Sequence, residues 1–337
     1  MSKKTKIAVL GAGQFGFYIS NFLGDSGFEN VYLNDIDESV IIALKNSRRH
    51  PKQFEKLDVV LSKNVKPTFD LEECISDAEI VFAAVPAQIM RDAIKNAKPY
   101  LKSGVILINV AKALELETSK RMDEVFKDEL EGLDYNIAAL AGAMIAAEGV
   151  KGDPLSAEIA CNDENIANYL KDLFGNYKLR LEPTTDLIGV ELAGALKNVY
   201  AIAGGICYQM YGASSTSTLL SKCSKEGGRF AIEYGAYGET FKTGSLAWLA
   251  DLAVTFSTGR NSIFGRKIIE LGSVDNALNF MKEENYTIEG YATTQVADEL
   301  ARRYEGNYPI IRLTHRVLYE GKDPKKEGKL LMRLKLN

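Results

Sequence analysis

The segment KIAVLGAGQFG, residues 6–16, decides the fold of this chain. Its first part, KIAVL at 6–10, predicts a buried strand, because near-continuous apolar runs are typical of strands covered on both faces of a parallel sheet. Helix-like residues from Phe15 to about Gly24 follow the glycines. A strand, a glycine-rich turn and a helix in this order predict the start of a doubly wound α/β sheet of the Rossmann type.

The glycine-rich turn also predicts a dinucleotide site. Gly11 permits the tight turn, Gly13 lets the backbone approach a pyrophosphate, and Gly16 lets the helix lie close to the sheet. The first N–H groups of the helix carry partial positive charge toward the phosphates. Gln14 lies inside this turn, and we count it with the three glycines as a cofactor contact. A glycine turn without a ligand is the alternative.

Asp35 indicates which dinucleotide is bound. It ends the second expected strand, 31–35, and lies 19 residues after Gly16. A carboxylate at this place accepts hydrogen bonds from the adenosine ribose hydroxyls and repels a 2′-phosphate. No arginine follows at residues 36–38. We therefore predict NAD(H) over NADP(H), with a helix cap or a loop charge as the alternative role of Asp35.

Three more apolar runs, at 65–69, 79–86 and 104–110, alternate with helix-like segments in the first half of the chain. This alternation predicts right-handed βαβ units in one parallel sheet. Pro86 ends the fourth expected strand, and Lys112 follows the fifth. Ligands bind beyond the carboxyl ends of such strands, so we expect both residues near the cofactor.

The second half has a helical pattern. A long helix rich in alanine and glycine is expected at 186–210, where small residues allow close helix packing. Further helices are expected at 214–237, 260–271, 275–283 and 292–304, and a solvated turn at 321–329. We expect a cofactor domain at 1–184 and an all-α domain at 185–337.

Composition excludes several classes of protein. The 337 residues carry 41 Lys and Arg against 45 Asp and Glu, a net charge of −4, which argues against a nucleic-acid partner. Two distant histidines and four scattered cysteines offer no metal-binding spacing. The longest nearly uncharged apolar stretch, 137–147, is too short to span a bilayer. With no signal peptide in view, we expect a cytoplasmic protein without a metal and with reduced, buried thiols.

Seven segments together resemble one family, the bacterial-type NAD(P)-dependent glycerol-3-phosphate dehydrogenases. They are GAGQFG at 11–16, AAVPA at 83–87, AKALE at 111–115, ELAGALKNVYAIAGGI at 191–206, DLAVT at 251–255, GRNSIFG at 259–265 and IEGYAT at 288–293. The resemblance spans nearly the whole chain, and the segment at 191–206 is the most specific. It implies reduction of dihydroxyacetone phosphate to sn-glycerol 3-phosphate for phospholipid synthesis.

The resemblance implies catalytic roles for three charged residues. Lys197 matches the catalytic lysine, Lys112 a lysine near the substrate and the nicotinamide, and Asp251 an aspartate at the substrate. The residues themselves also favour a lysine as the acid, because the chain has only two histidines and neither lies in a suggestive segment. Apolar neighbours of Lys197 would desolvate its ammonium and lower its pKa. A structural ion pair is the alternative role of Lys197.

Binding roles follow in the same way. Arg260 and Asn261 match a pair that holds the substrate phosphate, and their segment opens a helix where a polar cap is the alternative. Asn198 would bind the substrate or hold Lys197. Glu289 and Arg260 are expected at the cofactor, and Phe15 takes the place of an aromatic residue in the glycine loop.

One departure keeps other functions open. The family usually has Gly-Pro-Ser-Phe-Ala where this chain has GAMIA at 142–146, which replaces a polar contact by Met144. The alternatives are a dehydrogenase of the same design for another phosphorylated ketone or a hydroxy acid, and a non-catalytic NADH sensor. A homodimer through the helical domain also fits the family.

Overall fold

The chain forms two compact units in a computed structural model that describes residues 3–54, 57–284, 286–304 and 306–334. The sheet unit comprises Met1–Ala111, Met122–Leu140 and Met144–Leu187, and the helical unit comprises Lys112–Arg121, Ala141–Ala143 and Ile188–Asn337. The expected boundary between residues 184 and 185 thus lies three residues before the one in the structure. Two short segments that we expected in the cofactor domain cluster with the helical unit instead.

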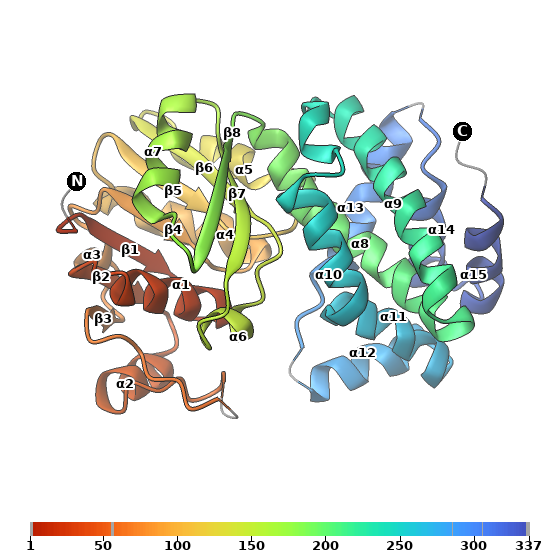
Figure 1. The fold of residues 1–337 in the computed structure, drawn as a ribbon, viewed down its shortest axis with the longest axis horizontal. Helices are drawn as coiled ribbons and strands as arrows, with labels where there is room; N and C mark the ends of the chain where they lie inside the picture. The colour runs from red at the N-terminus through yellow and green to blue at the C-terminus, as the bar shows by residue number, and fades with distance from the viewer. Residues whose placement is uncertain (1–2, 55–56, 285, 305, 335–337) are drawn as a thin grey trace. The chain divides into compact units, whose positions relative to one another are not determined.

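The sheet unit is built on eight strands in the order β3-β2-β1-β4-β5-β6-β7-β8 (Figure 1). They are β1 (Lys6–Leu10), β2 (Asn30–Asn34), β3 (Val65–Thr68), β4 (Ile80–Ala83), β5 (Val105–Asn109), β6 (Tyr135–Ala141), β7 (Leu155–Cys161) and β8 (Leu179–Thr184). β1 pairs in parallel with β2 on one side and with β4 on the other. The strand order therefore reverses beside β1, at the position where open α/β sheets bind ligands.

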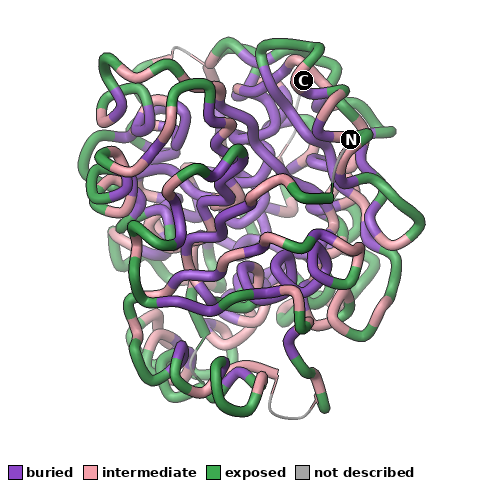
Figure 2. The backbone as a smooth tube through the Cα atoms, turned by 90° about the vertical axis from the view of Figure 1, so that its left-hand side faces the viewer, coloured by how far each residue is buried: buried purple, intermediate pink, exposed green. Residues whose placement is uncertain are grey.

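The helices of this unit are α1 (Gln14–Asp25), α2 (Glu38–Asn46), α3 (Leu71–Ile75), α4 (Ala87–Ala97), α5 (Met122–Glu129), α6 (Ala146–Gly149) and α7 (Glu164–Phe174), with a short 3₁₀ turn, η1 (Lys98–Tyr100). The core joins sheet and helices: Val9 of β1, Phe17 of α1 and Phe82 of β4 are all buried in one cluster. Figure 2 shows the buried backbone in the interior and the exposed backbone outside it. This packing fixes the turn between β1 and α1.

The helical unit contains α8 (Leu187–Tyr211), α9 (Ala213–Glu233), η2 (Gly238–Phe241), the π-helical η3 (Leu246–Ala250), α10 (Asp251–Thr258), α11 (Arg260–Leu271), α12 (Val274–Glu283), α13 (Glu289–Arg303), α14 (Pro309–Tyr319) and α15 (Pro324–Arg333). α8 runs among the other helices of the unit (Figure 1). A Cβ added to Gly205 would lie 2.0 Å from the Ser262 carbonyl oxygen, and one added to Gly265 would lie 2.1 Å from that of Ile202. Glycines thus let α8 and α11 cross closely, as expected from the small residues of α8.

Two expectations about secondary structure are wrong. The five expected strands omit β6, β7 and β8, which extend the sheet beyond β5. Residues 321–329 are not simply a solvated turn, because α15 begins at Pro324. Asp323 accepts hydrogen bonds from the N–H groups of Lys325 and Lys326, and proline at the first helical position is already suited to the helix.

α8 is the one helix within the described residues that is long and apolar enough to cross a membrane. Its most apolar window is 94 % buried inside the structure, which is typical of a core helix. The four cysteines are buried and free, as the sequence predicts.

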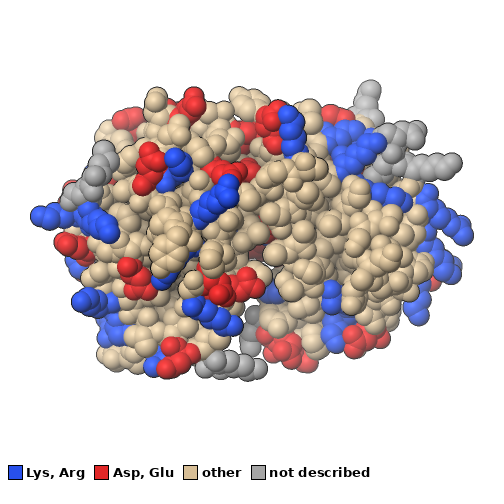
Figure 3. Space-filling model, viewed as in Figure 1, with Lys and Arg blue, Asp and Glu red and all other residues tan. Residues whose placement is uncertain are grey.

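Figure 3 shows charges of both signs interspersed over the sheet unit, and Lys and Arg gathered along the edge of the helical unit near α15. Surface ion pairs include Arg91 with Glu129 at 2.6 Å and Arg180 with Glu182 at 2.6 Å.

Candidate active site

The three glycines of the turn after β1 have different structural roles. Gly11 has a φ of +97°, and a Cβ there would lie 2.8 Å from the Ala84 carbonyl oxygen. A Cβ on Gly16 would lie 1.8 Å from the carbonyl oxygen of Gly11, whereas one on Gly13 would meet nothing within 4 Å. The fold thus requires the first and third glycines. The second leaves an open space beside the start of α1, and this space fits the pyrophosphate of a dinucleotide.

Asp35 links the end of β2 to the glycine turn. Its Oδ2 accepts a hydrogen bond from the Ala12 N–H at 2.6 Å, and its Oδ1 accepts one from the Asp37 N–H at 2.9 Å. The helix-cap alternative for Asp35 is wrong, because Asp37 caps α2 by accepting from the Ser39 N–H at 3.0 Å. The Asp35 carboxylate is only partly buried, so lone pairs remain for ribose hydroxyls.

The other expected cofactor contacts of the sheet unit lie around the same turn. Gln14 begins α1 and donates a hydrogen bond to the Gln53 Oε1 at 2.8 Å. Phe15 is partly buried, with its ring 5.7 Å from that of Tyr18. Pro86 is exposed at the start of α4, two residues after Ala84, which lies against Gly11.

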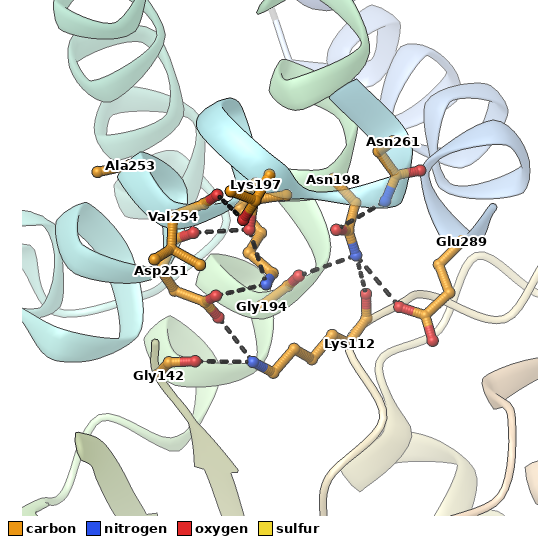
Figure 4. Close-up of polar contacts among 12 residues, drawn as sticks. Lys112, Gly142, Gly194, Lys197, Asn198, Asp251, Ala253, Val254, Asn261 and Glu289 are labelled. Carbon is orange, nitrogen blue, oxygen red and sulfur yellow. Dashed lines mark hydrogen bonds and ion pairs between the residues drawn. The ribbon is translucent and has the colours of Figure 1, made fainter. Parts of the chain in front are cut away.

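In the helical unit, one carboxylate joins two lysines. Asp251 is the first residue of α10 and is 1 % exposed. Its Oδ1 lies 2.5 Å from the Lys197 Nζ, and its Oδ2 lies 2.7 Å from the Lys112 Nζ (Figure 4). The structure thus brings together the three residues that the resemblance identifies as catalytic, although Lys112 and Asp251 are 139 positions apart.

The Lys197 ammonium is buried in the middle of α8. It donates to the Thr255 Oγ1 at 3.0 Å as well as to Asp251. Burial lowers the pKa of Lys197 to about 8, and the charge of Lys112 acts in the same direction, while the charge of Asp251 opposes both. The expected lowering of this pKa is confirmed. The ion pair that we gave as the alternative is also present, so the lysine is both paired and close to its titration range at neutral pH.

The side chain of Lys112 lies against α8 at Gly194, a residue without a side chain. A Cβ on Gly194 would come within 3.3 Å of the Lys112 Cγ, so glycine leaves room for the lysine. The Lys112 Nζ also donates to the Gly142 carbonyl oxygen at 2.9 Å. Gly142 opens the segment that departs from the family pattern. Met144 in the same segment is buried in the core cluster of the sheet unit.

Asn198 connects the cluster to α11 and α13. Its Nδ2 lies 3.1 Å from the Lys112 carbonyl oxygen and 3.2 Å from the Glu289 Oε2. Its Oδ1 accepts a hydrogen bond from the Asn261 Nδ2 at 2.9 Å (Figure 4). The Asn261 Oδ1 accepts one from the Gly290 N–H at 3.0 Å. The side chain of Asn261 therefore holds Asn198 in place.

Arg260 stands apart from this network. It is the exposed first residue of α11, and its side chain makes no hydrogen bond or ion pair with a described residue. The polar-cap alternative for this segment is wrong, since Gly259 occupies the cap position without a side-chain hydrogen bond. The Ser262 hydroxyl instead donates to the Phe256 carbonyl oxygen at 2.8 Å. The first turn of α11 thus keeps its N–H groups and an arginine fork available for an anion.

Sequence reasoning missed two side chains. Thr255 bonds to Lys197, and its place four residues after Asp251 on one helix could have identified it. His50, one of the two histidines to which the sequence assigned no role, has its Nε2 2.7 Å from the Ala12 carbonyl oxygen in the glycine turn. No spacing rule would have found that contact.

Comparisons with known proteins agree with these observations. Family models for the N-terminus and the C-terminus of NAD-dependent glycerol-3-phosphate dehydrogenase match residues 6–167 and 186–329. A glycerol-3-phosphate dehydrogenase (NAD(P)+) of Nitratidesulfovibrio vulgaris is 32 % identical over 323 residues, covering 95 % of this chain and 96 % of that protein. One from Clostridium perfringens is 34 % identical over 329 residues, covering 97 % of each.

The fold agrees as well. The crystal structure of glycerol-3-phosphate dehydrogenase from Coxiella burnetii covers 99 % of this chain and 100 % of its own, with a TM-score of 0.90 and 25 % identity. The resemblance inferred from the seven segments is therefore confirmed. The chain belongs to the NAD-dependent glycerol-3-phosphate dehydrogenase family, whose members are NAD(P)-dependent oxidoreductases.

Proposed function

We propose that this protein reduces dihydroxyacetone phosphate to sn-glycerol 3-phosphate with NADH, reversibly, and that Lys197 is the general acid and base. The buried Lys197 ammonium carries this proposal: its pKa is lowered to about 8, and it is held by Asp251 and Thr255. A general acid is most effective when its pKa lies near the working pH. The names of the full-length relatives support the same reaction.

The chemistry divides between cofactor and protein. When NADH is bound, its nicotinamide supplies the hydride. Lys197 gives its proton to the substrate oxygen and becomes a neutral amine. Asp251 holds Lys197 and Lys112 through separate oxygens, so the site keeps one ammonium when Lys197 is neutral. Before that proton is fully transferred, the charge of Lys112 would stabilise the negative charge that develops on the substrate oxygen.

We assign the substrate phosphate to the start of α11. Arg260 offers a fork of donors, and the first backbone N–H groups of the helix lie beside it. The backbone of Asn261 belongs to this first turn, whereas its side chain positions Asn198. Asn198 in turn keeps Lys112 and Glu289 in place.

We assign the cofactor to the glycine turn, with Asp35 at the ribose and a preference for NADH over NADPH. The open space at Gly13 and the partly exposed carboxylate of Asp35 support this placement. Gln14, Phe15 and Pro86 complete the contacts from the sheet unit. Lys112, Arg260 and Glu289 remain our proposed cofactor contacts from the helical unit.

The alternative of another substrate, a different phosphorylated ketone or a hydroxy acid, rested on Met144. That side chain is buried in the core of the sheet unit, so its apolar character is explained by packing and gives no reason to prefer another substrate. We further propose a cytoplasmic enzyme that works as a homodimer, with a cofactor domain over 1–184 and a helical domain over 185–337. Lys112 and Gly142 lie within 1–184 by number, but they cluster with the helical unit and act with it in this proposal.

The test is to follow NADH oxidation with dihydroxyacetone phosphate and with a panel of other phosphorylated ketones and 2-keto acids. We expect dihydroxyacetone phosphate to give the highest kcat/KM, and NADH to give a higher kcat/KM than NADPH. A better substrate in the panel would contradict the substrate assignment. Tight NADH binding without turnover of any ketone would show a sensor instead.

A further inference from the structure

The segment after α2 places a histidine ring against the glycine turn. His50 is 9 % exposed, and its Nε2 lies 2.7 Å from the Ala12 carbonyl oxygen. Its Nδ1 accepts hydrogen bonds from the N–H groups of Lys52 at 3.1 Å and Gln53 at 3.0 Å. A nitrogen that accepts two hydrogen bonds carries no proton, so the ring proton is on Nε2 and is donated to Ala12.

Neighbouring residues fix this ring. It meets the Phe17 ring of α1 edge-on, with the ring centroids 5.9 Å apart, and the Phe54 ring packs on Phe17 at 5.4 Å. Gln53 accepts a hydrogen bond from the Gln14 side chain at 2.8 Å. A hydrogen bond and two aromatic contacts thus attach the segment 50–54 to the start of α1. The imidazole therefore has little freedom to turn away from Ala12.

The contact decides how one peptide group is oriented. In the planar trans peptide between Ala12 and Gly13, the C=O and the N–H point in opposite directions. Holding the Ala12 carbonyl on His50 thus directs the Gly13 N–H away from the ring. No described residue accepts a hydrogen bond from that N–H, and the space beside Gly13 is open. Since glycine restrains its own backbone so little, the peptide could rotate readily without a partner for its carbonyl.

We propose that His50 is a positioning residue, which holds the Gly13 N–H toward the phosphates of the dinucleotide and does so only in its neutral form with the proton on Nε2. The inference rests on the proposed function in one respect, the placement of the cofactor at the glycine turn. His50 touches none of the groups assigned to the reaction. It therefore controls cofactor affinity and leaves turnover unchanged.

Protonation removes this control. A second proton would enter on Nδ1, where it would face the N–H donors of Lys52 and Gln53, so the charged ring could accept neither hydrogen bond and would be driven out of this position. The charged groups that face the ring are Asp35, Asp37 and Lys52. Burial lowers the pKa of His50 below its ordinary value of 6.5, against the opposing effects of the Ala12 carbonyl and the two carboxylates. NADH affinity is therefore constant at neutral pH and weakens as acid protonates the ring.

Two isosteric variants separate the roles of the two ring nitrogens. His50→Asn keeps an acceptor near Nδ1 for Lys52 and Gln53 but cannot reach Ala12. His50→Gln keeps a donor near Nε2 for Ala12 but loses the acceptor. We expect His50→Asn to raise the Kd of NADH roughly tenfold and His50→Gln to raise it less than threefold, with kcat and the KM for dihydroxyacetone phosphate within twofold of wild type. His315→Asn, which replaces the other histidine, is the control and should change none of these values.

Several results would overturn the proposal. An unchanged Kd of NADH in His50→Asn would do so. Equal losses of NADH affinity in the two variants would also do so, because they would mean that His50 only supports its own segment. If the variants do not fold, wild-type protein decides: nitrogen NMR of its two histidines must show His50 protonated on Nε2, and the Kd of NADH must rise as that signal titrates. NADH binding is measured by fluorescence without substrate, so a failure of ketone reduction would leave this result intact.

Discussion

The glycine turn of the sheet unit and the lysine cluster of the helical unit are built in opposite ways. The turn occupies six consecutive residues, and its geometry is set by backbone sterics at Gly11 and Gly16. The cluster joins three segments that are far apart in the sequence, Lys112, Lys197 and Asp251, through charged side chains. A local steric site tolerates little change in shape, whereas a dispersed electrostatic site tolerates little change in charge.

The largest effect should come from removing charge in the cluster. Lys197→Met keeps the length of the side chain and leaves Lys112 to neutralise Asp251, so the helical unit should still fold. We expect kcat to fall roughly 10³-fold, since a general acid contributes about 10²–10⁴ in rate, while the Kd of NADH stays near that of wild type. Lys267→Met, which removes a lysine paired with Glu270 on α11, is the matched control. If Lys197→Met keeps more than a tenth of the wild-type kcat, the lysine is not the acid.

The same contrast explains what the sequence alone predicts. Each glycine of the turn has a steric reason that holds within a few residues, so KIAVLGAGQFG predicts β1, α1 and the role of each glycine without other information. For the cluster, the sequence itself indicates only that Lys112 lies near the cofactor and that a lysine with apolar neighbours, Lys197, suits the acid; the role of Asp251 comes from the family resemblance. Their geometry, two ammonium groups on one carboxylate with Thr255 and the Gly142 carbonyl beside them, depends on tertiary contacts that no spacing predicts.

Errors in the fold have the same origin. The strand β6 lies in an apolar run that also fits a buried helix, and periodicity cannot separate the two in short runs. The contact of His50 with Ala12 spans 38 positions and depends on the path of the chain after α2. By contrast, Asp323 and Pro324 form a cap and a first turn that local rules could have predicted.

Glycine substitutions test the steric site, and here the expected effects are somewhat smaller. Gly13→Ala places a methyl group in open space, so the melting temperature should stay near that of wild type while the Kd of NADH rises roughly 100-fold, because the backbone can no longer approach a pyrophosphate. Gly16→Ala places the methyl group 1.8 Å from the Gly11 carbonyl oxygen, so it should destabilise the sheet unit itself.

Calorimetry and NADH fluorescence titration separate these two outcomes. Gly244→Ala is the control for Gly13→Ala, since a Cβ there also meets nothing within 4 Å and no ligand is assigned to that position. Normal NADH binding by Gly13→Ala would contradict the assignment of the cofactor to the glycine turn. The turn would then have a purely structural role.

Asp35 contributes to the glycine turn through both shape and charge. Its carboxylate accepts the hydrogen bond of the Ala12 N–H, and it also presents negative charge to the cofactor site. Asp35→Asn keeps one acceptor oxygen and removes the charge that repels a 2′-phosphate. We expect the ratio of kcat/KM for NADPH to that for NADH to rise roughly tenfold. Asp70→Asn changes a carboxylate that caps α3 after β3 and should leave the ratio unaltered. A ratio that does not move in Asp35→Asn would contradict the NADH assignment.

The smallest effect concerns pH, and its sign follows from the charges around Lys197. Reduction needs the protonated lysine, so kcat/KM for dihydroxyacetone phosphate should be level below the Lys197 pKa of about 8 and fall as pH rises through it. Glycerol 3-phosphate oxidation needs the neutral amine and should rise over the same range.

Two variants should move the midpoint of this profile in opposite directions. The Lys112 cation lowers the pKa of Lys197, so Lys112→Met should move the midpoint up by roughly one pH unit, whatever it costs in rate. The Asp251 carboxylate raises that pKa, so Asp251→Asn should move the midpoint down. pH–rate profiles of the two variants and of Lys267→Met measure both shifts. Shifts of the same sign would mean that the titrating group is not flanked by one charge of each kind, and Lys197 would lose its assignment even if its removal abolishes turnover.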